Sequence, residues 1–240
     1  MKEIQETLKD GTLVYGWKSE SPLTPVAPDY TYYLTEKEIF SKEECESWYE
    51  YLQKQEFILL DKFRTSSSDG QTGLGETSIT SRFHTFNLLK FDFHLVPELK
   101  KSIYDGVQTL LNIIDNTVWQ ETLYSNAWFN VMRQGEDMKP HFHGYHENSF
   151  YSFHIVINAI QPSFTSYYHP VKFQNEAFNV PNKVGYLTMF PNFIPHSVSP
   201  NRYKVPRVSI AGDIVPSTWL DVPNKPMSNE NYIKLGKIND

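Results

Sequence analysis

The chain contains 240 residues, of which 40% are hydrophobic and 15% aromatic, so it has enough apolar material for the core of one medium-sized domain. Its formal net charge of −6 argues against a nucleic-acid-binding protein and against a binder of anionic membranes. The single cysteine, Cys45, excludes an intramolecular disulfide, and no apolar segment approaches the ~20 residues of a membrane span, so we expect a cytoplasmic protein.

The first 120 residues are predicted to contain an extended segment and two helices. Residues 1–30 are polar and punctuated by prolines, which predicts an extended N-terminal arm. Ser41 and Glu44 have the spacing of a capping box, so a helix is predicted to begin there. Its apolar stripe consists of Cys45, Trp48, Tyr49 and Leu52. A second helix is predicted with Pro97 in its first turn. Its buried stripe consists of Leu99, Ile103, Val107, Leu110 and Ile114.

Between the two helices, residues 64–82 are rich in Ser, Thr and Gly. This composition predicts a loop. Its length suits either a lid over a site or a disordered segment, and the sequence does not choose between them. As a lid it would be the expected source of substrate specificity.

From Leu123 onward, apolar and polar residues alternate as they do in strands. Asn126, Trp128, Asn130 and Met132 would share one face of the first strand. Further strands are predicted at 150–158, 166–173, 183–190, 196–198 and 205–214. Short strands separated by Pro, Asn and Gly predict a mainly β (α+β) fold, either a sandwich or a jelly roll with two covering helices. We expect one domain over 31–215, helical over 36–120 and β over 121–215, followed by a C-terminal tail at 216–240.

Three histidines have the spacing of a metal site. His141 and His143 stand at i and i+2, so in a strand their side chains share a face, about 6.6 Å apart. His196, on a later predicted strand, would complete a facial set of imidazole ligands and leave half of the coordination sphere open. Because His146 and Glu147 follow directly, either is an alternative to His143 as the second ligand. We assign structural or surface roles to the histidines outside this pattern, which are His84, His94, His154 and His169.

Arg207 and Ser209 are the candidate anion-binding residues. They also stand at i and i+2, between apolar residues of a predicted strand. An arginine fork binds a carboxylate through two hydrogen bonds, and a serine hydroxyl adds another donor. Arg202 ranks below Arg207, because it lies in a turn-like Pro-Asn-Arg-Tyr segment.

Five segments in this order resemble the 2-oxoglutarate- and Fe(II)-dependent dioxygenases, and most closely their prolyl-4-hydroxylase-like, largely uncharacterised bacterial and phage members. The segments are 128–135 (WFNVMRQG), 141–143 (HFH), 185–191 (GYLTMFP), 195–198 (PHSV) and 207–210 (RVSI). The resemblance covers about residues 36–215. It implies a double-stranded β-helix (jelly roll) whose N-terminal helices pack on one sheet.

The resemblance also implies the occupants of the site. Fe(II) would be bound by His141 and His196, and 2-oxoglutarate, the cosubstrate, by Arg207 and Ser209. Asn126, Trp128 and Asn130 would face the same cavity and contact cosubstrate or substrate, although a core role suits these three equally well. The family usually has Asp or Glu where this chain has His143. The change replaces an anionic ligand by a neutral one, which should alter redox potential and metal preference.

Three functions follow from these features. The first is an oxygenase that couples oxidative decarboxylation of 2-oxoglutarate by O2 to C–H oxidation of a small-molecule or peptide substrate. The second is a zinc-dependent hydrolase or lyase, because three imidazoles suit Zn2+ as well as iron. The third is a non-catalytic jelly-roll binding module, since surplus aromatic residues suit carbohydrate stacking or self-association. The sequence leaves open the substrate, iron against zinc, and the oligomeric state.

Overall fold

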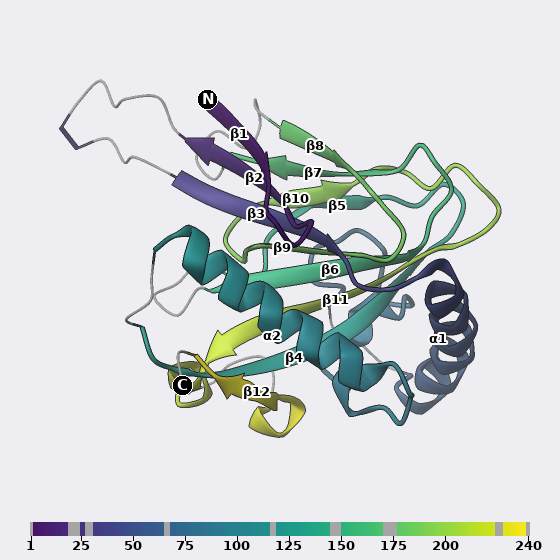
Figure 1. Cartoon of the computed structure of the whole chain (residues 1–240). Coiled ribbons are helices and arrows are strands. Elements are labelled where there is room, and N and C mark those ends of the chain that lie inside the picture. The colour runs from purple at the N-terminus through teal and green to yellow at the C-terminus, as the bar shows by residue number, and fades with distance from the viewer. Residues whose placement is uncertain are drawn as a thin grey trace.

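The computed structural model describes residues 2–18, 25–26, 31–64, 68–115, 119–144, 150–169, 177–223 and 228–238 (Figure 1). Within these ranges the strands form two sheets in which all neighbouring strands run antiparallel, which confirms the mainly β prediction. The larger sheet consists, in spatial order, of β1 (Lys2–Thr7), β2 (Leu13–Lys18), β3 (Thr31–Glu38), β9 (Tyr186–Pro191), β6 (Tyr151–Asn158), β11 (Arg207–Pro216), β4 (Thr122–Met132) and β12 (Ile233–Lys237). The smaller sheet consists of β5 (Met138–His141), β10 (His196–Val198), β7 (Phe164–Tyr168) and β8 (Ala177–Pro181).

An aromatic cluster joins the two sheets. Trp17 of β2 lies 4.9 Å from Tyr32 of β3 and 6.4 Å from Tyr167 of β7, measured between ring centroids. All three side chains are buried in one hydrophobic cluster with Phe190 of β9. One face of the larger sheet therefore packs against the smaller sheet, and the candidate site lies within this packed region.

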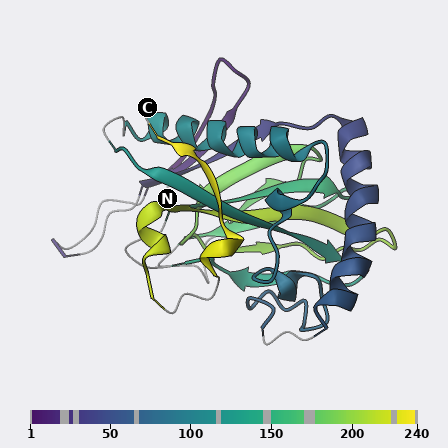
Figure 2. The ribbon, with the colours of Figure 1, turned by 90° about the horizontal axis from the view of Figure 1, so that it is seen from below.

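Two helices contribute to the core on the other face of the larger sheet. They are α1 (Lys42–Lys62) and α2 (Val96–Ile113). Figure 1 shows α2 lying obliquely in front of the larger sheet, and Figure 2 shows α1 standing at one end of the sheet. Trp48 of α1 and Ile103 of α2 are fully buried in a cluster with Phe129 of β4. Shorter helical elements are η1 (Thr80–Arg82), η2 (Leu88–Lys90), α3 (Ser217–Leu220) and η3 (Asn229–Asn231). No helix in the described ranges is long and apolar enough to cross a membrane.

The helix signals in the sequence are confirmed. Ser41 is the N-cap of α1, and its capping box with Glu44 is present in both directions. Pro97 lies in the first turn of α2. The expected burial of Ile114 is wrong, because α2 ends at Ile113 and the Ile114 side chain is 44% exposed.

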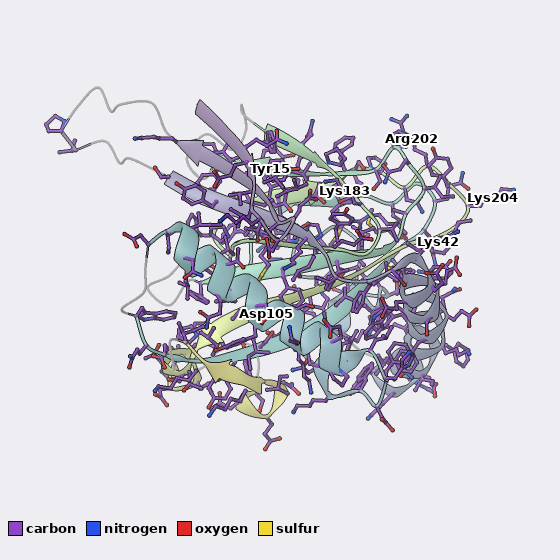
Figure 3. All side chains as sticks on the ribbon, viewed as in Figure 1. Tyr15, Lys42, Asp105, Lys183, Arg202 and Lys204 are labelled. Atoms are coloured by element: carbon purple, nitrogen blue, oxygen red, sulfur yellow. The ribbon has the colours of Figure 1, made fainter. Side chains whose placement is uncertain are left out.

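The prediction of a separate N-terminal arm at 1–30 is wrong where the structure describes it. Strands β1 and β2 form a hairpin that pairs with β3 and extends the larger sheet. Val14 and Trp17 are buried there, so burial of apolar side chains holds this segment in the domain. At the same end of the sheet, the buried carboxylate of Glu36 accepts hydrogen bonds from Tyr15 (3.2 Å) and Lys183 (2.8 Å), whose side chains are labelled in Figure 3.

The C-terminal residues do not form a free tail. Strand β12 pairs with β4 at the edge of the larger sheet. The hydroxyl of Tyr104 in α2 donates a hydrogen bond to the Lys237 carbonyl (2.7 Å), and Ile238 is fully buried. The segment 216–240 is therefore corrected from a tail to an edge strand with its connection, as far as its residues are described.

The loop between the helices is folded over its described part, 68–82. The Asp69 carboxylate accepts hydrogen bonds from the backbone N–H groups of Gln71 (3.0 Å) and Gly75 (2.9 Å). The buried Arg82 guanidinium donates to the carbonyls of Phe63 (2.9 Å) and Arg64 (3.0 Å). These bonds give residues 68–82 a defined conformation that is tied to the end of α1, and residues 65–67 lie outside the described ranges.

Candidate metal centre

The three histidines of the predicted metal site lie together. His141 ends β5 and His196 begins β10, and the two are direct partners in the antiparallel ladder. His143 follows in the loop, where its backbone N–H donates to the Asn192 carbonyl (3.0 Å). One ring nitrogen of each histidine lies within 4.8 Å of the others, a group that could hold a metal ion. The alternative ligands His146 and Glu147 lie outside the described residues.

Hydrogen bonds fix the tautomer of all three rings. The Nδ1 atoms of His141 and His196 lie 2.7 Å and 3.1 Å from the carbonyl oxygens of Lys139 and Ile194, respectively. The Nδ1 of His143 lies 2.6 Å from the Asp213 carboxylate. Because these oxygens accept, each Nδ1 carries the hydrogen and donates, which leaves each Nε2 lone pair for a metal. The donor set fits a transition metal.

Burial keeps two of these imidazoles neutral. Burial, with a contribution from the neighbouring His143, lowers the pKa of His141 to about 4. Burial also holds the pKa of His196 well below its usual range. A metal binds the neutral imidazole, so both side chains are ready for ligation at neutral pH without losing a proton.

Arg207 is a buried cation that has no anionic partner among the described residues. It begins β11 and is 4% exposed. Its Nη1 approaches only the Ser209 hydroxyl (3.4 Å) and the Met132 sulfur (3.5 Å), and its Nε is buried without a hydrogen-bond partner in the described part of the chain. No carboxylate from the described residues lies within ion-pair distance. Burial lowers its pKa to about 10, so it stays charged at neutral pH. An unpaired buried charge is costly, and an anionic ligand would remove that cost.

One cavity of about 110 Å³ connects Arg207 with the three histidines. Ser209, Trp128 and Asn130 line it, as the sequence predicts. Asn130 accepts a hydrogen bond from Thr80 (2.8 Å) and lies 3.5 Å from the Ser209 hydroxyl. The described loop contributes Asp69, Gly70 and Thr72 to the wall. Arg202, by contrast, is exposed at the outer edge of the molecule (Figure 3).

Asn126 does not line this cavity, although it was expected to face it. It shares a strand face with Trp128 and Asn130, but it lies farther along β4, opposite Asp213 of β11. Its side chain is 1% exposed, and both of its polar atoms lack a partner among the described residues. The position of Asn126 therefore supports a role in the core and not in the cavity.

His154 and Asp213 are two polar lining residues among those that sequence reasoning missed. His154 of β6 had been assigned a structural or surface role. Its Nε2 lies 2.7 Å from the Tyr167 hydroxyl, and its buried Nδ1 has no partner in the described chain. Burial, with a contribution from Arg207, lowers its pKa to about 3. Both faces of β6 are largely buried, so alternation in its sequence could not indicate which face meets the cavity.

Comparisons with known proteins were made at three levels. No family model matches the chain, and no curated protein matches its sequence. Among solved structures, the non-heme alpha-ketoglutarate-dependent carbocyclase SnoK from nogalamycin biosynthesis is 9% identical, with a TM-score of 0.54, over 84% of this chain and 91% of SnoK. The epimerase SnoN, in complex with Fe3+, alpha-ketoglutarate and nogalamycin RO, is 11% identical, with a TM-score of 0.53, over 84% of this chain and 93% of SnoN.

The chain has the fold of these non-heme, alpha-ketoglutarate-dependent enzymes. A prolyl-4-hydroxylase from Pseudomonas putida also matches, at 10% identity and a TM-score of 0.46, over 76% of this chain and 91% of that one. The chain therefore shares the mainly β, antiparallel fold of SnoK and SnoN, although so low an identity carries no residue-level assignment.

Proposed function

We propose that the chain is an Fe(II)- and 2-oxoglutarate-dependent oxygenase. The observation that carries this proposal is the Arg207 guanidinium, which has no anionic partner among the described residues and is buried in the same cavity as the three histidines that could hold a metal. A metal site alone would suit a zinc hydrolase equally well. A buried cation beside it calls for a ligand that presents a carboxylate, and 2-oxoglutarate is such a ligand.

In this proposal His141, His143 and His196 hold Fe(II). Arg207 and Ser209 bind the distal carboxylate of 2-oxoglutarate, while Asn130 and Trp128 line the space left for cosubstrate and substrate. When bound, the iron and 2-oxoglutarate supply O2 activation and the oxidative decarboxylation that is coupled to C–H oxidation. The chain itself positions these groups and limits water, since Trp128, Phe153 and Phe190 are buried side chains of the cavity wall. Hydroxylation of a small molecule or peptide is the proposed outcome.

We also propose that the two packed sheets form the double-stranded β-helix that the resemblance implies. The aromatic cluster between the sheets supports this architecture. Because β1, β2 and β12 pair into the larger sheet, the proposed domain takes in both the predicted arm and the predicted tail. It therefore extends beyond the predicted limits of 31–215.

An anaerobic titration tests the function. Metal-free protein receives Fe(II) and then 2-oxoglutarate, and the metal-to-ligand charge-transfer band is followed in the visible region. We expect a band that needs both additions and is absent in His196→Ala. Arg207→Ala should raise the 2-oxoglutarate concentration needed for half-maximal band by about 10- to 100-fold, the loss of a charged hydrogen bond of about 1.5–3 kcal/mol, with Fe(II) affinity unchanged.

The exposed Arg202 provides the matched control. Arg202→Ala removes an arginine from the turn before β11 but leaves the cavity intact, so its titration should match the unmodified chain. Tight zinc binding without a charge-transfer band would overturn the oxygenase proposal and support the hydrolase or lyase. Unchanged 2-oxoglutarate affinity in Arg207→Ala would refute the role of Arg207.

A further inference from the structure

Asp213 is a carboxylate of the cavity wall that contacts one of the metal ligands, His143. Its Oδ1 accepts hydrogen bonds from His143 Nδ1 (2.6 Å) and from the Ser152 hydroxyl (2.7 Å). Asp213 lies on β11, directly opposite Ser152 on β6, so the ladder holds the carboxylate in place. Its side chain is 23% exposed and that of His143 10%, so water screens the pair only partly.

The position of Asp213 on its strand is tied to the rest of the site. Arg207, Ser209, Ala211 and Asp213 follow one another at every second residue of β11, and all four line the cavity. One strand therefore delivers both the cation that suits an anionic ligand and the carboxylate behind a metal ligand. Asp213 is not available as a counterion for Arg207, since no ion pair between them is present in the described residues.

The role of the Asp213 carboxylate follows from the net charge of the metal and its ligands. Three neutral imidazoles leave a divalent metal at +2, whereas a site with two histidines and one carboxylate leaves it at +1. The hydrogen bond from His143 to Asp213 places a carboxylate behind one imidazole, so the His143–Asp213 pair contains the group that a directly bound carboxylate would supply. In this arrangement the carboxylate of Asp213 lies on the far side of the His143 imidazole and not in the metal's coordination sphere.

We infer that Asp213 is a positioning residue for the metal, which orients the His143 ring and supplies the negative charge that the third histidine lacks. This inference rests on the metal site of the proposed function but does not depend on the reaction. A carboxylate that accepts from a ligating imidazole increases the basicity of that ligand, and its loss typically costs 10- to 100-fold in metal affinity.

Two substitutions separate orientation from charge. Asp213→Asn keeps an oxygen that can accept from His143 Nδ1 but removes the negative charge. Asp213→Ala removes both. The control is Asp137→Asn, which removes a carboxylate from the approach to β5 that pairs with Lys139 and not with a metal ligand. Apoprotein unfolding in denaturant establishes that each variant is folded before metal is added.

The first measurement is the dissociation constant for Zn2+, obtained by competition with a chromogenic chelator. We expect about 10- to 100-fold weaker binding in Asp213→Asn and at least as large a loss in Asp213→Ala, with Asp137→Asn unchanged. Unaltered zinc affinity in folded Asp213→Asn and Asp213→Ala would overturn the inference. If Asp213→Ala does not fold, Asp213→Asn decides alone.

The second measurement is the position of the charge-transfer band with Fe(II) and 2-oxoglutarate. Removing a negative charge near the iron lowers the energy of its d orbitals, so the band of Asp213→Asn should move to shorter wavelength. An unmoved band would contradict the charge role. Failure of the proposed function gives a different pattern, in which the unmodified chain shows no band while zinc affinity still falls in the Asp213 variants.

Discussion

The Nε2 atom of His154 and the hydroxyl of Tyr167 lie 2.7 Å apart. This contact joins β6 of the larger sheet to β7 of the smaller sheet. Burial raises the pKa of Tyr167 well above its usual range and lowers that of His154 to about 3, so both groups are neutral at pH 7. With the hydroxyl as donor to Nε2, the buried Nδ1–H of His154 has no acceptor in the described part of the chain and lies in the field of the Arg207 charge.

We expect this unused donor to contact the anion that Arg207 binds. His154→Leu should therefore weaken 2-oxoglutarate binding by about 10-fold, within the range for hydrogen bonds to charged groups, and leave Fe(II) affinity unchanged. Titration of the charge-transfer band measures both constants. Tyr167→Phe retains the imidazole and should have a smaller effect. Equal 2-oxoglutarate affinities in His154→Leu and the unmodified chain would refute this contact.

The buried neutral histidines predict how the stability of the apoprotein depends on pH. In the folded chain the pKa of His154 is about 3, whereas in an unfolded chain it is near 6.5. Between these two pH values the unfolded state binds more protons than the folded state. The free energy of unfolding is therefore highest above pH 6.5, and it decreases as the pH falls from 6.5 toward 3. The loss is at most about 1.4 kcal/mol per pH unit for this group.

Urea unfolding of the apoprotein at pH 7, 6 and 5 measures that dependence. His154→Leu should flatten it, while the part due to His141 and His196, whose pKa values are also lowered by burial, should persist. A stability that is constant from pH 7 to 5 would show that these histidines are not neutral in the folded apoprotein.

Metal should stabilise the folded chain by mass action. A ligand at 100 times its dissociation constant adds about 2.7 kcal/mol when it binds only the folded state. We expect Zn2+ to raise the melting temperature, EDTA to reverse the rise, and His196→Ala to abolish it. Thermal unfolding followed by circular dichroism provides the measurement. An equal rise in His196→Ala would place the bound metal elsewhere.

The C-terminal strand should contribute to stability. Ile238 is fully buried, so Ile238→Ala should lower the free energy of unfolding by about 2–5 kcal/mol. Ile114→Ala is the matched control, since the same truncation at a side chain that is 44% exposed should cost much less. Denaturant unfolding of the two variants compares them. Similar losses would mean that β12 is not part of the core in solution.

The sequence predicted the parts of this structure that local signals encode. The capping box of Ser41 and the first-turn Pro97 marked α1 and α2. The i, i+2 spacing of His141 and His143, with His196 on a later strand, identified a cluster that the β5–β10 pairing brings together. These signals act over a few residues, or through residue types that are uncommon in other roles.

The missed parts depend on pairings between distant segments. Strand β1 reads as polar and charged, and β5 and β8 are short, so only their partners show them to be strands. The link between Asp213 and His143 spans 70 residues and depends on the register of β11 against β6. No local pattern could place those two side chains at hydrogen-bond distance.

The strand that carries Arg207, Ser209 and Asp213 has a consequence for ligand size. Strand β11 is hydrogen bonded on both sides, to β4 and β6, so it cannot slide or bend as a loop does. Side chains on one face of a strand are spaced by about 6.6–6.8 Å. The sheet therefore fixes the position of Arg207 relative to Asp213, whose carboxylate holds the His143 ring. We expect a dicarboxylate that is one methylene shorter or longer than 2-oxoglutarate to contact either Arg207 or the metal, but not both.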